Sequence, residues 1–274
     1  MTVHEQFNTL TPIQMAWLQE LGIDRRLLQT SFNASDESAS RADSAESKVT
    51  KYPTPVRNVD EQVARRSAVM PAAPADVKPV QLSPDLAGLQ ADAAACTRCE
   101  LHAGRHQAVF GSGHIEAPDW MVIGEAPGDQ DDQLGLPFQG PAGQLLQAVF
   151  DASGLSSESS FYYTNAVKCR PRGGRVPRKE EMDACLPFLH AQINQVRPRA
   201  ILVLGWLAAQ ALLQQKGSIE QLRERTHVYA ASYGQVPVIV TYHPAALLLR
   251  GRHKAQVWRD MHLARSLKSN GQES

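Results

Sequence analysis

The four cysteines of this chain are spaced like the ligands of a metal centre. Cys96 and Cys99 form a C-x2-C pair, and fifteen residues separate Cys169 from Cys185. Thiolates are soft ligands, and four of them suit either a tetrahedral zinc ion or a [4Fe-4S] cluster. Because the chain has a close pair and no spare cysteine, four unrelated buried thiols are the weaker interpretation. The spacing leaves zinc and iron–sulfur open, although the wide second pair is less typical of a zinc ribbon.

A glycine-rich loop is the second feature that could carry chemistry. It follows the apolar run Trp120–Ile123, turns at Gly124 and Pro127-Gly128, passes an acidic cluster and contains one aromatic side chain, Phe138. Apolar residues then recur at helical spacing from Leu145. In α/β sheets such a loop lies at the carboxyl end of a strand, where ligands bind. The loop lacks the Gly-Lys-Ser/Thr ending of a triphosphate site, and its glycines and single aromatic suit a flat ring.

Two polar residues fall at the ends of other predicted strands. Asn165 lies in the aromatic-rich segment 161–169, and His243 follows the apolar run 237–241. A structural role is the ordinary interpretation of a buried amide or a lone histidine. An amide beside a pocket, however, offers a donor and an acceptor to the polar edge of a base. A histidine at the same sheet edge is a candidate catalytic group.

The elements that must position these residues alternate between strand and helix. Apolar runs predict strands at 120–123, 161–169, 200–205 and 237–241, and periodic segments predict helices at 179–196, 206–215 and 252–267. This alternation favours an α/β fold, a three-layer α/β/α sandwich around a central, mainly parallel four-stranded sheet. The strand ends at Gly124, Asn165 and His243 should then converge on one face.

The first 83 residues differ in composition from the rest. Residues 10–28 have the pattern of a short amphipathic helix, so residues 1–30 either dock on the main domain or bind another protein. Residues 31–83 are rich in Ser, Ala, Asp and Pro, which predicts a disordered linker. The globular domain is expected at 84–268, with a disordered tail at 269–274. No run is apolar enough to span a membrane, and the polar N-terminus favours a cytoplasmic protein, which we expect to be a monomer.

Charge is balanced overall but uneven along the chain. The sequence has 28 basic and 28 acidic residues, which argues neither for nor against nucleic acid. Residues 168–179 carry six basic residues and no acid, and residues 250–265 carry five basic residues and one acid. Both segments are candidate phosphate contacts, with solvated surface as the alternative.

Four motifs together resemble the family 4 uracil-DNA glycosylases. They are Gly-Glu-Ala-Pro-Gly at 124–128, Gly-Leu-Pro-Phe-Gln-Gly-Pro-Ala-Gly at 135–143, Thr-Asn-Ala-Val-Lys-Cys-Arg-Pro at 164–171 and His-Pro-Ala-Ala-Leu-Leu at 243–248. The resemblance covers about residues 86–267. It implies a DNA repair enzyme acting on uracil-containing DNA, in which Cys96, Cys99, Cys169 and Cys185 hold a structural [4Fe-4S] cluster rather than zinc.

The resemblance also implies roles for residues of the pocket. The nucleotide would be flipped out of DNA, and Phe138 would stack on the uracil ring. Asn165 would bind the O4 and N3–H edge, and the backbone around Gly124, Glu125 and Ala126 would contact the O2 side. His243 would donate a hydrogen bond to O2 as the leaving uracil becomes anionic.

Other roles concern the DNA and the water. Leu247 would wedge into the base stack, and the DNA backbone would lie near Lys168, Arg172, Arg175 and Arg250. Asp131 replaces the longer Glu that is usual in the family and would gate against the thymine methyl. Glu125 is a candidate to orient the hydrolytic water.

Two alternatives remain at this point. One is a related branch that traps uracil-DNA covalently, although segment 143–161 lacks the basic, histidine-bearing insertion of that branch. The other is a non-catalytic DNA-binding module, recruited to a replication or repair protein through residues 10–28.

Overall fold

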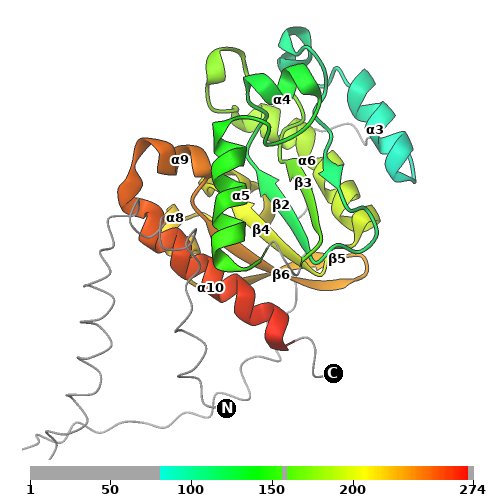
Figure 1. Cartoon of the computed structure of the whole chain (residues 1–274). Coiled ribbons are helices and arrows are strands. Elements are labelled where there is room, and N and C mark those ends of the chain that lie inside the picture. The colour runs from blue at the N-terminus through cyan, green and yellow to red at the C-terminus, as the bar shows by residue number, and fades with distance from the viewer. Residues whose placement is uncertain (1–80, 156–158, 271–274) are drawn as a thin grey trace, which may run out of the picture. The chain divides into compact units, whose positions relative to one another are not determined.

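A computed structural model describes residues 81–155 and 159–270 of the chain (Figure 1). The helix predicted within residues 1–30, nearly all of the predicted linker and the last four residues of the predicted tail lie outside these ranges. None of the helices in the described part of the chain is both long and apolar enough to cross a membrane.

One six-stranded sheet forms the centre of the fold, with its strands in the order β1-β3-β2-β4-β6-β5. The four inner strands are parallel, and the two edge strands pair antiparallel to their neighbours. The predicted four-stranded parallel sheet is therefore confirmed, with two edge strands that the sequence did not predict. The strands are β1 Ser112–Gly113, β2 Trp120–Gly124, β3 Phe161–Asn165, β4 Ala200–Leu204, β5 Thr226–Ala231 and β6 Gly234–Thr241.

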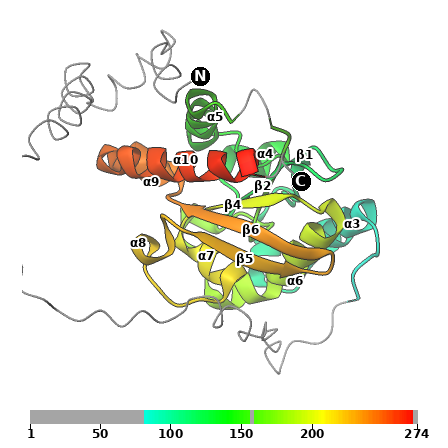
Figure 2. The same cartoon turned by 90° about the horizontal axis from the view of Figure 1, so that it is seen from below.

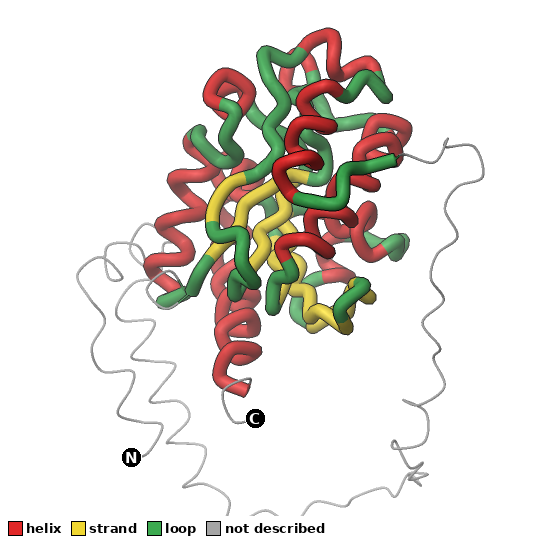
Figure 3. The backbone as a smooth tube through the Cα atoms, turned by 90° about the vertical axis from the view of Figure 1, so that its right-hand side faces the viewer, coloured by secondary structure: helices red, strands yellow, loops and turns green. Residues whose placement is uncertain are grey.

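Helices cover both faces of the sheet, which confirms the three-layer sandwich (Figures 2 and 3). One layer contains α5 Pro141–Ser153, α9 Pro244–Leu249 and α10 Lys254–Asn270. The other contains α3 Leu86–Ala95, α6 Lys179–Val196, α7 Trp206–Leu213 and the short α8 Ile219–Leu222. Because both faces are covered, β2 and β4 are buried at every position, which explains why their sequences are apolar runs without alternation.

The structure corrects several predicted boundaries. The acidic cluster forms a short helix, α4 Asp129–Leu134, where a loop was expected. Strand β3 ends at Asn165, and the chain then turns before Cys169. The predicted helix 252–267 starts at Lys254 and continues to Asn270, preceded by α9 and by the 3-10 turn η5 Gly251–His253. Two further 3-10 turns are η3 Glu100–Gly104 and η4 Arg172–Gly174.

Candidate functional site

The carboxyl ends of β2, β3 and β6 bring together residues that are distant in sequence. Gly124 and Asn165 are paired in the parallel register of β2 and β3. A Cβ atom on Gly124 would collide with the Asn165 amide and the Phe138 ring, so only glycine fits there. The Phe138 ring centroid lies 6.4 Å from that of His243. The predicted convergence of glycine, aromatic, amide and histidine is therefore present.

The loop that carries Phe138 is braced by Asp131. Phe138 has a φ of 59°, and its carbonyl group packs so closely on Gly143 that a Cβ there would clash. Asp131 is 7 % exposed and accepts hydrogen bonds from the backbone N–H of Gly128 at 3.0 Å and of Gln139 at 2.7 Å. The carboxylate thus joins the start of α4 to the Phe138 loop, a bracing role that sequence analysis missed. Its predicted role as a gate stays a prediction.

Asn165 differs from the other buried amide of the sheet region. Gln192 is fully buried, and its amide bonds Phe110 O at 2.9 Å and the Tyr162 hydroxyl at 3.1 Å. Asn165 is 1 % exposed, yet neither Oδ1 nor Nδ2 has a hydrogen-bond partner among the residues that the structure describes. Because an unpaired buried amide costs free energy, its retention points to a ligand that supplies the missing donor and acceptor. The amide of Gln192 is fully hydrogen-bonded within the protein, so its role is structural.

His243 is held as a neutral hydrogen-bond donor. Its Nδ1 accepts the Ala245 N–H at 3.2 Å, which caps α9 and leaves the ring proton on Nε2. Burial lowers the pKa of His243 to about 4, and the nearby negative charge of Asp131 only partly opposes that shift. The imidazole is therefore uncharged at neutral pH and can donate through Nε2.

Glu125 follows β2, and its side chain reaches the start of α7. Its Oε1 accepts the Leu207 N–H at 3.3 Å and packs against Gly205, which has a φ of +94°. Burial raises the pKa of Glu125 above its ordinary value, and the hydrogen bond from Leu207 opposes the rise. Ala126 follows as a partly buried residue, and Val167 N–H donates to Glu125 O at 3.1 Å. The Gly124–Ala126 backbone is thereby tied to the turn after Asn165.

The four cysteines line one small pocket between the α3–η3 segment, the turn after β3 and α6. Within the described ranges, no three His, Cys, Asp or Glu side chains lie close enough to hold a single metal ion. Positive groups and N–H donors surround the thiols instead. Arg105 Nη1 lies 3.0 Å from Cys169 Sγ, and Lys168 N–H donates to Cys185 Sγ at 3.3 Å. Arg98 also lines the pocket, and its buried Nη1 has no hydrogen-bond partner in the described part of the chain. Four thiols surrounded by cationic and N–H groups could hold an anionic sulfide cluster.

Two residues predicted to meet DNA are buried instead. Lys168 is 1 % exposed, and its Nζ donates to Thr164 Oγ1 and to Asn165 O, each at 2.7 Å. The prediction of a phosphate contact through Lys168 is wrong, and the side chain instead braces the turn below Asn165. Leu247 is 3 % exposed because α9 packs against α5. It is therefore not placed to enter a base stack.

The three arginines predicted to lie near DNA are on the surface. Arg175 is engaged with Glu181 through two hydrogen bonds of 2.8 and 2.6 Å, and Arg172 Nη2 donates to Ala103 O at 3.0 Å. Arg250 is exposed where α9 meets η5. Arg172 and Arg175 therefore stabilise the η4 loop and remain accessible to solvent.

Tyr163 is a site neighbour that sequence analysis missed. Its ring lies 5.9 Å from Phe138 in an edge-on arrangement. Tyr163 precedes Asn165 by two residues on β3, so the alternation of a strand already placed the two side chains on one face. The alternation of side chains along β3 could therefore have identified Tyr163 as a neighbour of the pocket.

Comparison with known proteins gives consistent matches. Residues 110–262, more than half of the chain, match the family model described as the uracil DNA glycosylase superfamily. The chain is 37 % identical over 170 residues to the type-4 uracil-DNA glycosylase of Pyrobaculum aerophilum, covering 61 % of this chain and 86 % of the relative. It is 39 % identical over 158 residues to that of Sulfurisphaera tokodaii, covering 56 % and 71 %. It is 39 % identical over 154 residues to that of Thermotoga maritima, covering 56 % and 78 %.

Proposed function

The chain belongs to the type-4 uracil-DNA glycosylases of the uracil DNA glycosylase superfamily, and from that premise we propose how its residues remove uracil from DNA. The enzyme hydrolyses the N-glycosidic bond between uracil and deoxyribose and leaves an abasic site. The observation that carries the assignment of the pocket is the unpartnered, buried Asn165 amide between Phe138 and Gly124.

Uracil is recognised by stacking and by its polar edge. A base must leave the duplex stack to reach a pocket at the sheet edge. The Phe138 ring supplies the stacking face, and Asn165 supplies a donor for O4 and an acceptor for N3–H. Cytosine presents the opposite pattern on that edge, so it would leave both amide groups unpaired. Buried unpaired groups give the strong form of discrimination.

Bond cleavage is assisted by His243. As the glycosidic bond breaks, negative charge develops on uracil, and the Nε2–H of the neutral imidazole donates to O2. A donor aimed at the position of developing charge stabilises the transition state more than the ground state. Glu125 Oε1 is bonded to the start of α7, so Oε2 is the oxygen that orients the attacking water. The Gly124–Ala126 backbone contacts the O2 side of the base.

The iron–sulfur character of type-4 enzymes is assigned here to Cys96, Cys99, Cys169 and Cys185 as ligands of a [4Fe-4S] cluster. When bound, the cluster supplies a cross-link between the α3–η3 segment, the turn after β3 and α6. The residues of this chain support it through the Arg105 contact with Cys169 and the Lys168 N–H bond to Cys185. Such bonds to thiolate sulfur are typical of iron–sulfur sites.

Replacing Cys185 by serine tests this assignment. The wild-type protein is expected to be brown, with broad visible absorption, and Cys185→Ser is expected to lose most of that absorption and to have a lower Tm. The physical reason is that one of four ligands and the α6 anchor are removed together. Visible spectra, iron and sulfide analysis and thermal melts measure it. Asn165→Ala is the control and should stay brown. A colourless wild-type protein containing one zinc ion would contradict the assignment.

The wedge that fills the base stack is reassigned to the exposed end of α9. Leu248 is 54 % exposed and Leu249 is 86 % exposed, whereas Leu247 is buried. An apolar side chain can enter a vacated stack only from an exposed position. The accessible arginines Arg172, Arg175 and Arg250 remain proposed phosphate contacts, since they are the surface cations of the two basic segments.

Alanine substitutions separate the two leucines. Leu249→Ala is expected to lower excision from double-stranded DNA by about tenfold, because unstacking costs a few kcal/mol that the wedge offsets. Excision from single-stranded DNA and the Tm should stay unchanged. Leu247→Ala is expected to destabilise the fold by about 2–5 kcal/mol through a core cavity. Equal rates of Leu249→Ala and wild type on duplex DNA would rule out this wedge.

Incubation of the full-length protein with a DNA strand containing a single uracil tests the proposed function. Excision is scored as strand cleavage after alkali, with identical strands carrying cytosine or thymine as controls. Cleavage at uracil alone is expected. Binding without cleavage would support the non-catalytic alternative, and a shifted protein–DNA band on a denaturing gel would show covalent trapping. Either result would overturn the assignment.

A further inference from the structure

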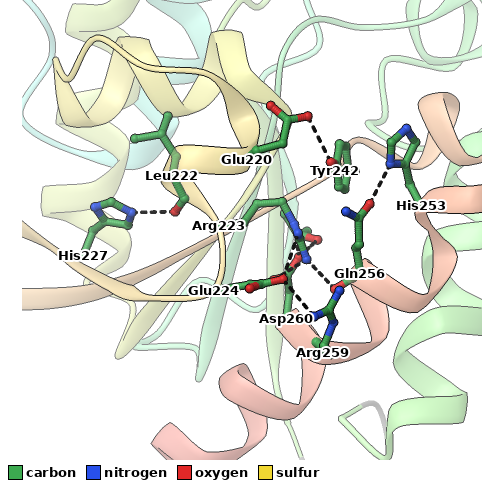
Figure 4. Close-up of polar contacts among 11 residues, drawn as sticks. Glu220, Leu222, Arg223, Glu224, His227, Tyr242, His253, Gln256, Arg259 and Asp260 are labelled. Atoms are coloured by element: carbon green, nitrogen blue, oxygen red, sulfur yellow. Dashed lines mark hydrogen bonds and ion pairs between the residues drawn. The ribbon is translucent and has the colours of Figure 1, made fainter. Parts of the chain in front are cut away.

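A buried ion pair between Arg223 and Asp260 (Figure 4) contacts the end of β6, two residues before His243. Arg223, which follows α8, meets Asp260 of α10 in a two-point contact, with Nε to Oδ2 at 2.8 Å and Nη2 to Oδ1 at 2.9 Å. Their side chains are 2 % and 0 % exposed. Arg223 Nη2 also donates to Gln256 O at 2.6 Å, so the guanidinium is fixed on α10 at two positions. None of these residues belongs to the pocket described above.

The ion pair contacts Thr241 and Tyr242, the two residues that precede His243. The Thr241 hydroxyl donates to Asp260 Oδ2 at 2.6 Å, and the Arg223 guanidinium lies 5.0 Å from the centroid of the Tyr242 ring. The Tyr242 ring is also 4.4 Å from the ring of His253, and its hydroxyl lies 3.2 Å from Glu220 Oε1. Strand β6 is therefore tied to α10 at the point where the chain enters α9.

The imidazole of His243 depends on this backbone for its position. Its recorded hydrogen bond in the described structure is with Ala245, two residues further along the same chain segment. That bond orients the ring relative to α9 but does not fix α9 relative to Asn165 and Phe138. Gly205, which follows β4, donates its N–H to Thr241 O at 2.9 Å and holds the end of β6. The packing of α9 on α5 and the side-chain contacts of Thr241 and Tyr242 supply further restraint.

A buried ion pair is weak support for stability, because desolvation of two charges offsets most of their attraction. The pair is better explained by the geometry it imposes. Beyond the bonds within the pair and to Gln256, Asp260 accepts from Thr241 and Arg223 lies over the Tyr242 ring, so the pair contacts both residues before the histidine. We propose that Asp260, together with Arg223 and Thr241, positions His243 against the uracil pocket. This inference rests on the proposed function, and the residues act through His243 rather than on the substrate.

Thr241→Val tests the proposal with a substitution of nearly equal volume. It removes the hydroxyl donor to Asp260 but leaves the Arg223–Asp260 pair in place. A displacement of about 1 Å at a catalytic group can cost about 10²-fold in rate, so the single-turnover rate of uracil excision should fall by about 10- to 100-fold. The Kd for DNA carrying a non-hydrolysable 2′-fluoro-deoxyuridine should change by less than about twofold. Thr241→Ser keeps the hydroxyl and should restore most of the rate.

Ser153→Ala is the matched control. Ser153 is also buried, and its hydroxyl donates to Phe150 O at 3.1 Å, so the variant removes one buried hydroxyl bond at the far end of α5. Its rate should equal that of the wild type. Asp260→Asn should act in the same direction as Thr241→Val, and its Tm shows whether the fold persists.

The position of the ring is measured independently of activity. Histidine-selective NMR should show changed His243 ring signals in Thr241→Val and unchanged signals in Ser153→Ala. If wild-type protein leaves uracil intact, the proposed function fails, while the ring signals still test the positioning. Wild-type rate and wild-type ring signals in Thr241→Val would overturn the inference, as would a loss confined to Kd or an equal loss of rate in Ser153→Ala.

Discussion

Replacing His243 by alanine is expected to slow uracil excision by about 10²–10³-fold, the effect typical of removing one donor from an oxyanion-type site. The imidazole is neutral and bears its proton on Nε2, so it is ready to donate without first losing or gaining charge. Single-turnover rates with enzyme in excess measure the effect on the chemical step. Binding of 2′-fluoro-deoxyuridine DNA and the visible spectrum should stay close to those of the wild type. A loss of less than tenfold would remove His243 from its assigned role.

The pH dependence follows from the same residue. Because the pKa of His243 is lowered from 6.5 to about 4, the rate should not fall near pH 6.5 but only as pH approaches about 4. Between those values the unfolded chain binds more protons at this position than the folded protein does. Stability linked to His243 is therefore present above pH 6.5 and decreases as pH falls toward 4. The free energy of unfolding, measured with urea at several pH values in this window, should depend less steeply on pH in His243→Ala than in the wild type.

Replacing Asn165 by alanine is the second change with a large expected effect. It removes both groups that meet the polar edge of uracil and leaves O4 and N3–H of the bound base unpaired. Each such loss costs about 1–3 kcal/mol, so the excision rate should fall by about 10²–10⁴-fold. The kcat and the Kd for substrate DNA, measured on matched uracil and cytosine strands, check the result. Near-normal excision by Asn165→Ala would invalidate the base-reading role.

A paired comparison with Gln192 sharpens the test of Asn165. The Asn165 amide makes no hydrogen bond with the described protein, so Asn165→Ala should change the Tm little. Gln192→Ala removes an amide bonded to Phe110 O and Tyr162, so it should lower the Tm clearly. The two variants should therefore have opposite effects: Asn165→Ala loses activity but keeps its Tm, whereas Gln192→Ala loses stability. If both behave alike, burial rather than ligand recognition explains Asn165.

The sequence predicted the central strands and the place where their ends meet, because each of these follows from the pattern of a single element. The runs 120–123 and 200–205 are apolar without alternation, so both faces of their strands must be buried. These strands lie at the centre of the sheet. The convergence of Gly124, Asn165 and His243 followed from parallel strand direction alone. The polar pattern of β5 was less clear, because it is an edge strand with alternating exposure and pairs with one neighbour only.

Side-chain direction could not be predicted in short or tightly folded segments. Helix α9 has six residues, too few for periodicity to show that Leu247 is buried while Leu249 is exposed. Lys168 stood in a basic run that indicated surface. Its partners, Thr164 and the carbonyl of Asn165, become available only after the chain turns back at the end of β3. A lysine satisfied by such local oxygens carries no sign of burial in its sequence.

The strand order has a consequence for how activity appears during folding. Gly124, Phe138 and Asn165 are synthesised before β6, but β6 reaches them only by pairing with β4, which itself pairs with β2. Contacts between parallel strands far apart in sequence form slowly, because the closure of long loops must come first. His243, two residues after β6, therefore reaches the pocket only once β6 has paired with β4. A chain in which β6 has not paired with β4 lacks His243 at the pocket, so we expect activity to appear only with that pairing.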